Sequence, residues 1–356
     1  MDTKYSKLFS GAYRIGLGYL LIPMLYIILI HAFLVQSAFC QETSSNTKQL
    51  RLLVGSGPGG AYDSYGRTIA SYMSRHLPNS PKIIIQNMPG VGSLILTNHL
   101  YHVAPRDGSV IAAVHSLTAT HPLFFPDQAK YDVNSLNWIG SAARESIIGI
   151  FWSNSKIKKF DETFNNEVII AGSTGSTSSF PLFTNTILGT RFNIVKGYSA
   201  TSAGLLAMER GEVEGVVGIT VSALRSIGEA YSASGKIKVL VQFGMNKHPD
   251  FPDVPWIFDY AKTEDQRGAM NLMFGTQEFG RPFIAPPNVS ARTIKILEEA
   301  FLATLQDKQF LDEAEKRRLD INYTSPEEIR KIIKQMYSVS PSIVAEVKKM
   351  LGDQVQ

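Results

Sequence analysis

Cysteine is almost absent from this chain of 356 residues, in which Cys40 is the only one. A single cysteine at the end of an N-terminal apolar segment excludes a disulfide framework, a cysteine nucleophile and a cysteine-ligated metal site. Two enzyme motifs are also missing from the sequence. It contains no Gly-Lys-Ser/Thr sequence of a P-loop and no Gly-x-Ser-x-Gly nucleophile elbow. The sequence therefore gives no support to a P-loop NTPase or a serine hydrolase.

Charged side chains are absent from residues 15–39, which follow Lys4, Lys7 and Arg14 and lead into Cys40 through Ala38-Phe39. A basic start, an apolar stretch and a small-x-small ending are typical of an export signal. We therefore expect residues 1–40 to be a signal peptide and the mature chain to be periplasmic. The stretch is also long enough to span a bilayer, so an uncleaved anchor is the alternative. Lipidation at Cys40 is disfavoured, because residues 37–39 are a poor lead-in for that modification.

A strong excess of either charge is absent as well. Without residues 1–40 the chain keeps 32 basic and 30 acidic residues, a net charge of +2. This balance gives no indication of a nucleic-acid partner. The roughly 316 remaining residues can fill two domains of ordinary size.

Clusters of metal-ligating residues are not evident. His99 and His102 lie three apart on one face of a predicted helix, but no carboxylate is close in sequence, so ordinary surface placement is the better interpretation. No paired carboxylates follow a predicted strand. We therefore expect no metal, no cofactor and no catalytic residue.

The most informative stretch is residues 50–63. An apolar run at 52–54 predicts a buried strand, glycines at 55, 57, 59 and 60 form a corner, and the apolar spacing from Tyr65 predicts a helix. Backbone without Cβ atoms at the start of a helix is suited to binding an anion. The same glycines match a dinucleotide fingerprint, but the next strand, at 82–85, is followed by Gln86-Asn87 rather than the required acid.

The pattern of a strand, a corner and a helix recurs later in the chain. A strand at 168–171 leads into a Gly/Ser/Thr run at 172–179 and then a helix. Such a run is often a flexible linker, but its place between a strand and a helix favours a second anion-binding corner. Further strands are expected at 110–114, 213–217 and 237–241, and helices at 94–103, 203–209, 291–306 and 326–337, with an extended segment at 281–287. Strands joined by helices predict parallel sheets.

Five short motifs occur in an order and spacing that resemble one family. They are Gly-Gly-Ala-Tyr-Asp at 59–63, Gln-Asn-Met-Pro-Gly-Val-Gly at 86–92, Ala-Pro-Arg-Asp-Gly at 104–108, Tyr-Asp at 131–132 and Phe-Pro-Asp-Val-Pro at 251–255. This pattern resembles the Bug family, the extracytoplasmic solute receptors of tripartite tricarboxylate transporters. The resemblance covers about residues 50–352.

The resemblance implies an α/β class II periplasmic-binding-protein fold, with two lobes, a hinge and a ligand cleft between the lobes. It assigns residues 48–148 and 281–356 to lobe 1 and residues 149–280 to lobe 2. It also implies a small carboxylate ligand, held by backbone N–H groups of both lobes, and a permease or sensor partner, and we expect a monomer. The implied ligand contacts are Ser56, Gly59, Gly60, Ala61 and Asp63 in lobe 1 and Thr174, Gly175, Ser176, Thr177 and Ser178 in lobe 2. Asp63 has the alternative role of charge–dipole stabilisation of its helix. Strand-end positions add Ser116, Thr118, Tyr198 and Gly218 as candidates.

Two departures from the family pattern bear on the ligand. The segment 197–200 keeps Tyr198 but lacks the usual lysine, and residues 216–220 lack the aspartate that commonly ends this strand. An acid there can meet the ammonium group of an amino acid, so its absence predicts a carboxylate without an amino group. The alternative from another class of function is an exported α/β enzyme that acts on a carboxylate.

Overall fold

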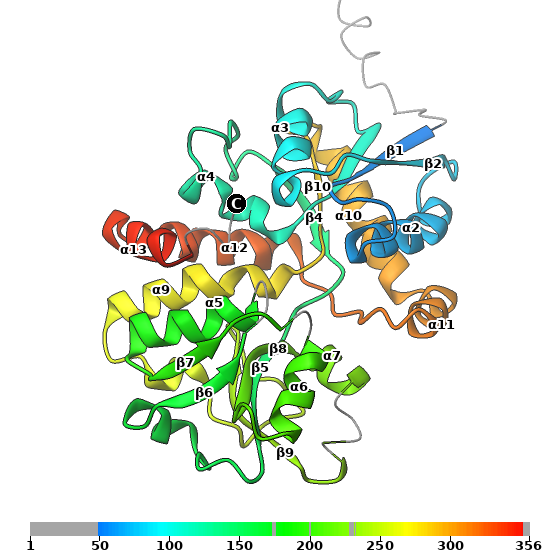
Figure 1. The fold of residues 1–356 in the computed structure, drawn as a ribbon. Helices are drawn as coiled ribbons and strands as arrows, with labels where there is room; N and C mark the ends of the chain where they lie inside the picture. Colours follow the sequence, from blue (N-terminus) through cyan, green and yellow to red (C-terminus); the bar gives the residue numbers. More distant parts are fainter. Residues whose placement is uncertain (1–48, 173–175, 199–200, 228–230, 232, 352–356) are drawn as a thin grey trace, which may run out of the picture. The chain divides into compact units, whose positions relative to one another are not determined.

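The computed structural model describes residues 49–172, 176–198, 201–227, 231 and 233–351. Their strands form two five-stranded sheets with helices packed on them (Figure 1). The first sheet has the strand order β2-β1-β3-β10-β4. Its strands are β1 (Gln49–Val54), β2 (Lys82–Asn87), β3 (Val110–Ala113), β4 (Asn137–Ser141) and β10 (Pro282–Ala285). β1 runs parallel to β2 and β3, whereas β10 lies antiparallel between β3 and β4.

The second sheet repeats this arrangement in the order β7-β6-β8-β5-β9. Its strands are β5 (Ile147–Trp152), β6 (Val168–Ala171), β7 (Phe192–Val195), β8 (Gly215–Thr220) and β9 (Ile237–Phe243). β6 is parallel to β7 and β8, and β5 is antiparallel to β8 and β9. β1 and β3 in one sheet therefore correspond to β6 and β8 in the other. Ligand sites of α/β folds form beyond the carboxyl ends of such strands.

Two segments connect the sheets, and they are bonded to each other. The first crossing (residues 142–146) leads from β4 to β5, and the return crossing (residues 275–281) leads into β10. The Glu145 N–H donates to the Gln277 carbonyl at 2.8 Å, and the Ala142 N–H donates to the Arg281 carbonyl at 3.0 Å. Two ion pairs, Arg144–Glu278 at 2.9 Å and Arg281–Glu145 at 2.6 Å, join the same segments. Hydrogen bonds and ion pairs therefore hold the two crossings together.

The opening strand and helix form as their pattern predicts. In β1, Leu50, Leu52 and Val54 are buried, and helix α2 (Ala61–Met73) buries its apolar face in the same cluster. The helix crosses the sheet closely at Gly66, where a Cβ would lie 3.1 Å from Val54 Cγ2. The predicted sequence of strand, glycine corner and helix is confirmed here.

Two long helices near the C-terminus have the predicted bounds, α10 (Ala291–Gln306) and α12 (Pro326–Tyr337). Each begins after a serine whose hydroxyl accepts a backbone N–H: Ser290 accepts from Thr293 at 3.1 Å, and Ser325 accepts from Glu328 at 3.2 Å. Such side chains satisfy N–H groups that the first turn leaves open. The other helices are α3 (Leu94–His102), α4 (His121–Phe124), α5 (Ser176–Phe183), α6 (Thr201–Glu209), α7 (Val221–Ile227), α9 (Glu264–Phe274), α11 (Lys308–Lys316) and α13 (Pro341–Leu351).

Several strands differ from the expected ones. The strand expected at 213–217 begins at Gly215 and extends to Thr220, because it pairs antiparallel with β5 from Ile147 to Phe151. The extended segment at 281–287 contains β10, which pairs with two strands. β4, β5 and β7 were not predicted. The sheets are therefore mixed, since a strand that arrives from the other sheet enters each of them antiparallel.

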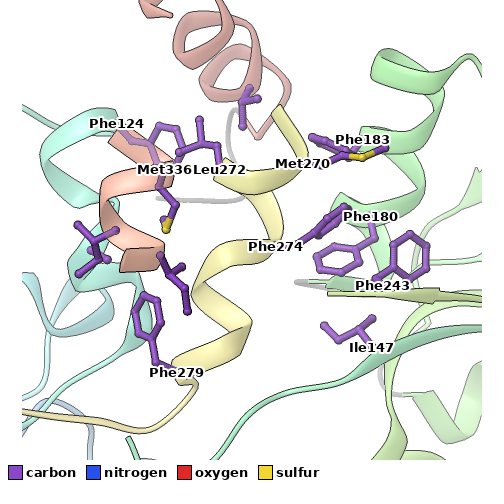
Figure 2. Packing of buried hydrophobic residues seen from close by; sticks show 14 of the residues in the cluster. Phe124, Ile147, Phe180, Phe183, Phe243, Met270, Leu272, Phe274, Phe279 and Met336 are labelled. Atoms are coloured by element: carbon purple, nitrogen blue, oxygen red, sulfur yellow. The ribbon is translucent and has the colours of Figure 1, made fainter. Parts of the chain in front are cut away.

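The largest cluster of buried apolar residues includes side chains from both sheets. Phe180, Phe243 and Ile147 lie on one side of α9, Phe124 and Met336 lie on the other, and α9 itself contributes Leu272 and Phe274 (Figure 2). A second cluster joins β1, α2 and α10, and a third joins β8 and α6. Within the described ranges no helix is both long and apolar enough to span a membrane. The predicted signal, residues 1–40, lies outside these ranges.

Candidate ligand-binding site

A cavity of about 500 Å³ has walls that come from both sheets. The segment that follows β3 supplies one wall, from His115 to Phe124, and the start of α5 with the end of β8 supplies another. Both crossings contribute as well, through Glu145 and Gln277. The volume falls in the range of small-molecule sites, which is roughly 300–1,000 Å³. The position agrees with the rule that ligands bind beyond the carboxyl ends of parallel strands.

Two of the predicted site residues line this cavity from opposite sheets. Ser116 opens the short turn after β3 and is 8% exposed. Ser176 is the first residue of α5, and its hydroxyl donates to the Gly218 carbonyl at 2.6 Å. The amino end of a helix carries partial positive charge, so the start of α5 is electrostatically suited to an anion.

Gly218 explains how the amino end of α5 comes to line the cavity. Gly218 has φ +101°, and a Cβ there would lie 2.2 Å from the Ser176 carbonyl oxygen. The absence of a side chain at Gly218 therefore lets the amino end of α5 lie directly on β8. Thr177 and Ser178 are buried in the first turn of α5. Thr174 and Gly175 lie outside the described residues, so their predicted contacts stay predictions.

The first glycine corner is near the surface and is not part of the wall of this cavity. The Gly59 N–H donates to Asp63 Oδ2 at 2.8 Å, and the Gly60 N–H donates to the Gly57 carbonyl at 3.3 Å. Two N–H groups of the predicted anion site are thus used within the corner. The assignment of Ser56, Gly59, Gly60 and Ala61 as ligand contacts stays a prediction.

Asp63 is the brace of this corner. Its side chain is 3% exposed, accepts from Arg67 Nε at 2.8 Å and accepts from the Asn87 amide at 2.8 Å. The Asn87 amide also donates to the Ser56 carbonyl at 2.9 Å. Burial opposes the charge, but the hydrogen bonds from Arg67, Asn87 and Gly59 outweigh it and lower the pKa of Asp63 to about 2. In this arrangement the carboxylate fixes the loop.

We expect Asp63→Ala to lower the free energy of unfolding by about 1–2 kcal/mol, because hydrogen bonds to a charged group are lost while water can reach the exposed corner. Urea denaturation measures this loss. The control Asp127→Ala removes an exposed carboxylate and should change stability by less than about 0.5 kcal/mol. Full stability of Asp63→Ala would contradict the bracing role and favour direct ligand contact.

Tyr62 connects the corner to the cavity, and the sequence prediction missed it. Its ring centroid lies 4.6 Å from that of His115, and the Arg281 guanidinium carbon lies 4.5 Å from the Tyr62 ring centroid. Burial raises the pKa of Tyr62 to about 12, so the hydroxyl stays protonated at neutral pH. The aromatic ring directly after Ala61 in the predicted corner was the available signal.

Two histidines line the cavity and were also missed: His115 is half-buried and His121 is buried. His115 follows β3 and its Nδ1 accepts the Leu117 N–H at 3.3 Å, whereas His121 begins α4 and is 2% exposed. Burial lowers the pKa of each ring to about 4. Both histidines are therefore neutral at pH 7 and bring no positive charge to the cavity.

His121 predicts a pH dependence of stability. Its pKa falls from 6.5 in the unfolded chain to about 4 in the folded one, so below pH 6.5 the unfolded state binds a proton that the folded state does not. The contribution of neutral His121 to the free energy of unfolding is therefore fully present above pH 6.5, and it is lost progressively as the pH falls to about 4. Of the loss between pH 7 and pH 5, we expect His121 alone to account for about 1–2 kcal/mol. Urea unfolding at pH 7 and pH 5 measures this change. The free energy of unfolding should fall less in His121→Gln than in the wild type, whereas the control His102→Gln, at an exposed position, should lose as much as the wild type.

Two other candidates lie away from the cavity wall. Thr118 is fully buried, its hydroxyl lies 3.2 Å from that of Thr97, and its carbonyl accepts the Tyr131 hydroxyl at 2.8 Å. Tyr198 is half-buried against the third apolar cluster. In the described part of the chain, no group of three His, Asp or Glu side chains is placed to hold a metal ion.

Comparisons with known proteins identify the family and the fold. The family model of the tripartite tricarboxylate transporter family receptor matches residues 66–348. A search of curated proteins gives no match. A TctC solute-binding protein from Polaromonas is similar in structure, with a TM-score of 0.67 and 15% identity over 87% of this chain and 99% of its own.

Two further solved structures share the fold. The periplasmic binding protein BugD has a TM-score of 0.52 and 18% identity over 85% of this chain and 97% of its own. An R. palustris protein with adipate has a TM-score of 0.53 and 15% identity over the same shares of the two chains. These identities show the fold alone, whereas the family model matches most of the sequence. The chain belongs to the receptors of the tripartite tricarboxylate transporter family and has the fold of periplasmic binding proteins.

Proposed function

We propose that this receptor is exported, binds a small carboxylate in the cavity lined by Ser116 and Ser176, and delivers it to a membrane permease. The observation that carries the proposal is that one cavity takes walls from both sheets. A ligand that touches both walls stabilises the arrangement in which they are close, so binding favours closure. A permease can then distinguish the loaded receptor from the empty one.

A carboxylate is favoured as the ligand by the polar groups of the two walls. Ser116 presents a hydroxyl from one side, Ser176 begins α5 on the other, and the helix dipole of α5 favours negative charge at that amino end. The similar R. palustris protein was obtained with adipate, a dicarboxylate. The predicted backbone contacts at 174–178 would add N–H donors at the same end of α5.

Isothermal titration calorimetry with a panel of organic acids tests the proposal, with mass spectrometry of the ligand after long incubation. We expect at least one carboxylate to bind with a Kd of about 10 μM or tighter and to be recovered unchanged. Micromolar affinity corresponds to about 8 kcal/mol. The absence of binding by every acid in the panel would refute the proposal, and conversion of a bound acid would support the enzyme alternative.

The two serines give a matched test of two-sided binding. We expect Ser116→Ala and Ser176→Ala each to weaken ligand binding about 2- to 10-fold: the first removes a hydroxyl from one wall, and the second removes the bond to Gly218 that holds the start of α5 in the other wall. Ser71→Ala is the control, because Ser71 is exposed on α2 and its hydroxyl bonds only to the Arg67 carbonyl among the described contacts. If only one of the two cavity serines affected binding, the ligand would contact a single wall.

Export, partners and lobes complete the proposal. Cleavage near Cys40 would give a mature chain that begins around Gln41, which N-terminal sequencing of the exported protein checks. The lobe boundaries 48–148, 149–280 and 281–356 and the monomeric state stay predictions. Light scattering of the purified protein measures the oligomeric state, and transport by membranes that contain a cognate permease would identify the partner.

A further inference from the structure

Gln277 has a buried amide that the fold leaves without a partner. Gln277 is 5% exposed, lies in the turn η7 (Gly275–Phe279) of the return crossing, and lines the cavity. Neither its amide nitrogen nor its amide oxygen has a hydrogen-bond partner in the described structure. Buried polar groups are normally paired, and an unpaired one destabilises the fold. The cavity wall therefore carries a donor and an acceptor to which a ligand can bond.

The surface of the remaining wall is mainly apolar, although Thr120, Ser179, Thr220 and Thr276 also line it. The apolar side chains come from the turn after β3, from α4, α5 and α9 and from the strand β5, and four of them are seen around α9 in Figure 2. They are Phe124, Ile147, Phe180 and Leu272, together with Leu117 and Met273. Burial of a ligand against such side chains is favourable only for an apolar surface. The occupant therefore has an apolar body.

The charges at the wall set a second limit on the occupant. Among the described lining residues, only His115, His121 and Glu145 can carry charge near neutral pH, and burial keeps both histidines neutral. Glu145 is negative, but it is paired with Arg281 at 2.6 Å. None of these groups compensates the second or third charge of a polyanion. An uncompensated buried carboxylate is very costly.

Together these observations identify a class of ligand, on the premise of the proposed function. We propose that the cavity binds an organic acid with one carboxylate, an apolar body, and a carbonyl or hydroxyl group that pairs with the Gln277 amide. Gln277 is then a specificity-determining residue for that polar group. Compact polyanions such as citrate would bind more weakly.

Calorimetry with the full-length mature protein tests this inference on four named acids: 5-oxohexanoate, hexanoate, malate and citrate. We expect 5-oxohexanoate to bind about tenfold tighter than hexanoate, because the keto group accepts from the Gln277 amide, and both to bind tighter than citrate. Gln277→Leu should bring the ratio between 5-oxohexanoate and hexanoate close to one. The control Gln335→Leu, at an exposed position of α12, should keep the wild-type ratio.

A stability measurement keeps the test independent of binding. Without ligand, Gln277→Leu should melt at the same temperature as the wild type or higher, since it removes an unpaired buried amide. A lower melting temperature together with an unchanged ratio would overturn the role of Gln277. Tighter binding of citrate or malate would overturn the ligand class while leaving the proposed carboxylate receptor intact. Failure of all four acids, and of the wider panel above, would overturn both.

Discussion

Gly218→Ala is expected to lower the free energy of unfolding by about 3–5 kcal/mol and to weaken ligand binding more than tenfold. The new Cβ would lie 2.2 Å from the Ser176 carbonyl oxygen, 2.6 Å from its carbonyl carbon and 3.0 Å from Thr177 Cα. All three atoms are backbone, so α5 would have to move away from β8. The positive φ adds strain of roughly 1–2 kcal/mol to the cost of overpacking. Urea denaturation and calorimetry measure the two effects.

Gly211→Ala separates these two causes. Gly211 also has a positive φ, +74°, but a Cβ there meets no atom within 4 Å. We expect this control to lose only about 1 kcal/mol, from backbone strain alone, and to keep wild-type affinity. Equal losses in the two variants would mean that the contact between α5 and β8 contributes nothing measurable, and the geometric account of the α5 wall would then be wrong.

The local parts of the site could be predicted from the sequence. The apolar run of β1, the glycines after it and the helical spacing from Tyr65 all lie within one short stretch, and the same holds for β6 and α5. Neighbouring residues alone determine these units, because a strand, a turn and a helix have their own periodicities. Ser176 was predicted within the second of these units, and Ser116 was predicted from its place after the strand expected at 110–114; both line the cavity.

The parts of the site that depend on long-range pairing could not be predicted. Glu145 and Gln277 meet in the cavity because a backbone hydrogen bond joins two crossings that are far apart in the sequence. β5 and β10 likewise pair antiparallel with strands that are distant in the sequence. No local composition marks such a pairing. The segment 281–287 was accordingly predicted only as an extended chain.

The first glycine corner shows a different limit. Its glycines predicted bare backbone, but Asp63, four residues after Gly59, accepts the Gly59 N–H and is held by Arg67. The side chain that reaches the cavity side is Tyr62, through its contact with the ring of His115. Which of two adjacent first-turn residues contacts His115 depends on the angle between α2 and the sheet, and composition does not reveal that angle.

Glu278 bonds the return crossing to the first crossing and to the segment after β9. Its side chain is 8% exposed and accepts from Arg144 Nη1 at 2.9 Å. It also accepts from the Met245 N–H at 2.9 Å and from the Asn246 amide at 3.1 Å, just after β9. Arg144 in turn pairs with Glu328 at the start of α12, at 2.8 Å. One buried carboxylate thus links the two crossings, the second sheet and a C-terminal helix.

We expect Glu278→Ala to lower the free energy of unfolding by about 3–4 kcal/mol. The substitution leaves a partly buried guanidinium and a backbone N–H without their acceptor, and breaking a buried pair typically costs about 3–5 kcal/mol. Arg144 keeps its ion pair with Glu328 in this variant, so the expected loss lies near the lower end of that range. Equilibrium unfolding in urea measures the change, with Glu327→Ala as the control, since Glu327 is an exposed acid on the first turn of α12.

Glu278→Gln and a double mutant identify the source of the loss. Glutamine keeps an acceptor for the Met245 N–H but removes the charge that Arg144 meets, so we expect a smaller loss, of about 1–2 kcal/mol. In the double mutant Arg144→Ala/Glu278→Ala the combined loss should fall short of the sum of the single losses by about 1–3 kcal/mol, because the two residues are in contact. Additive losses would mean that the two side chains act separately, and the crossings would then be held together by their backbone hydrogen bonds rather than by this ion pair.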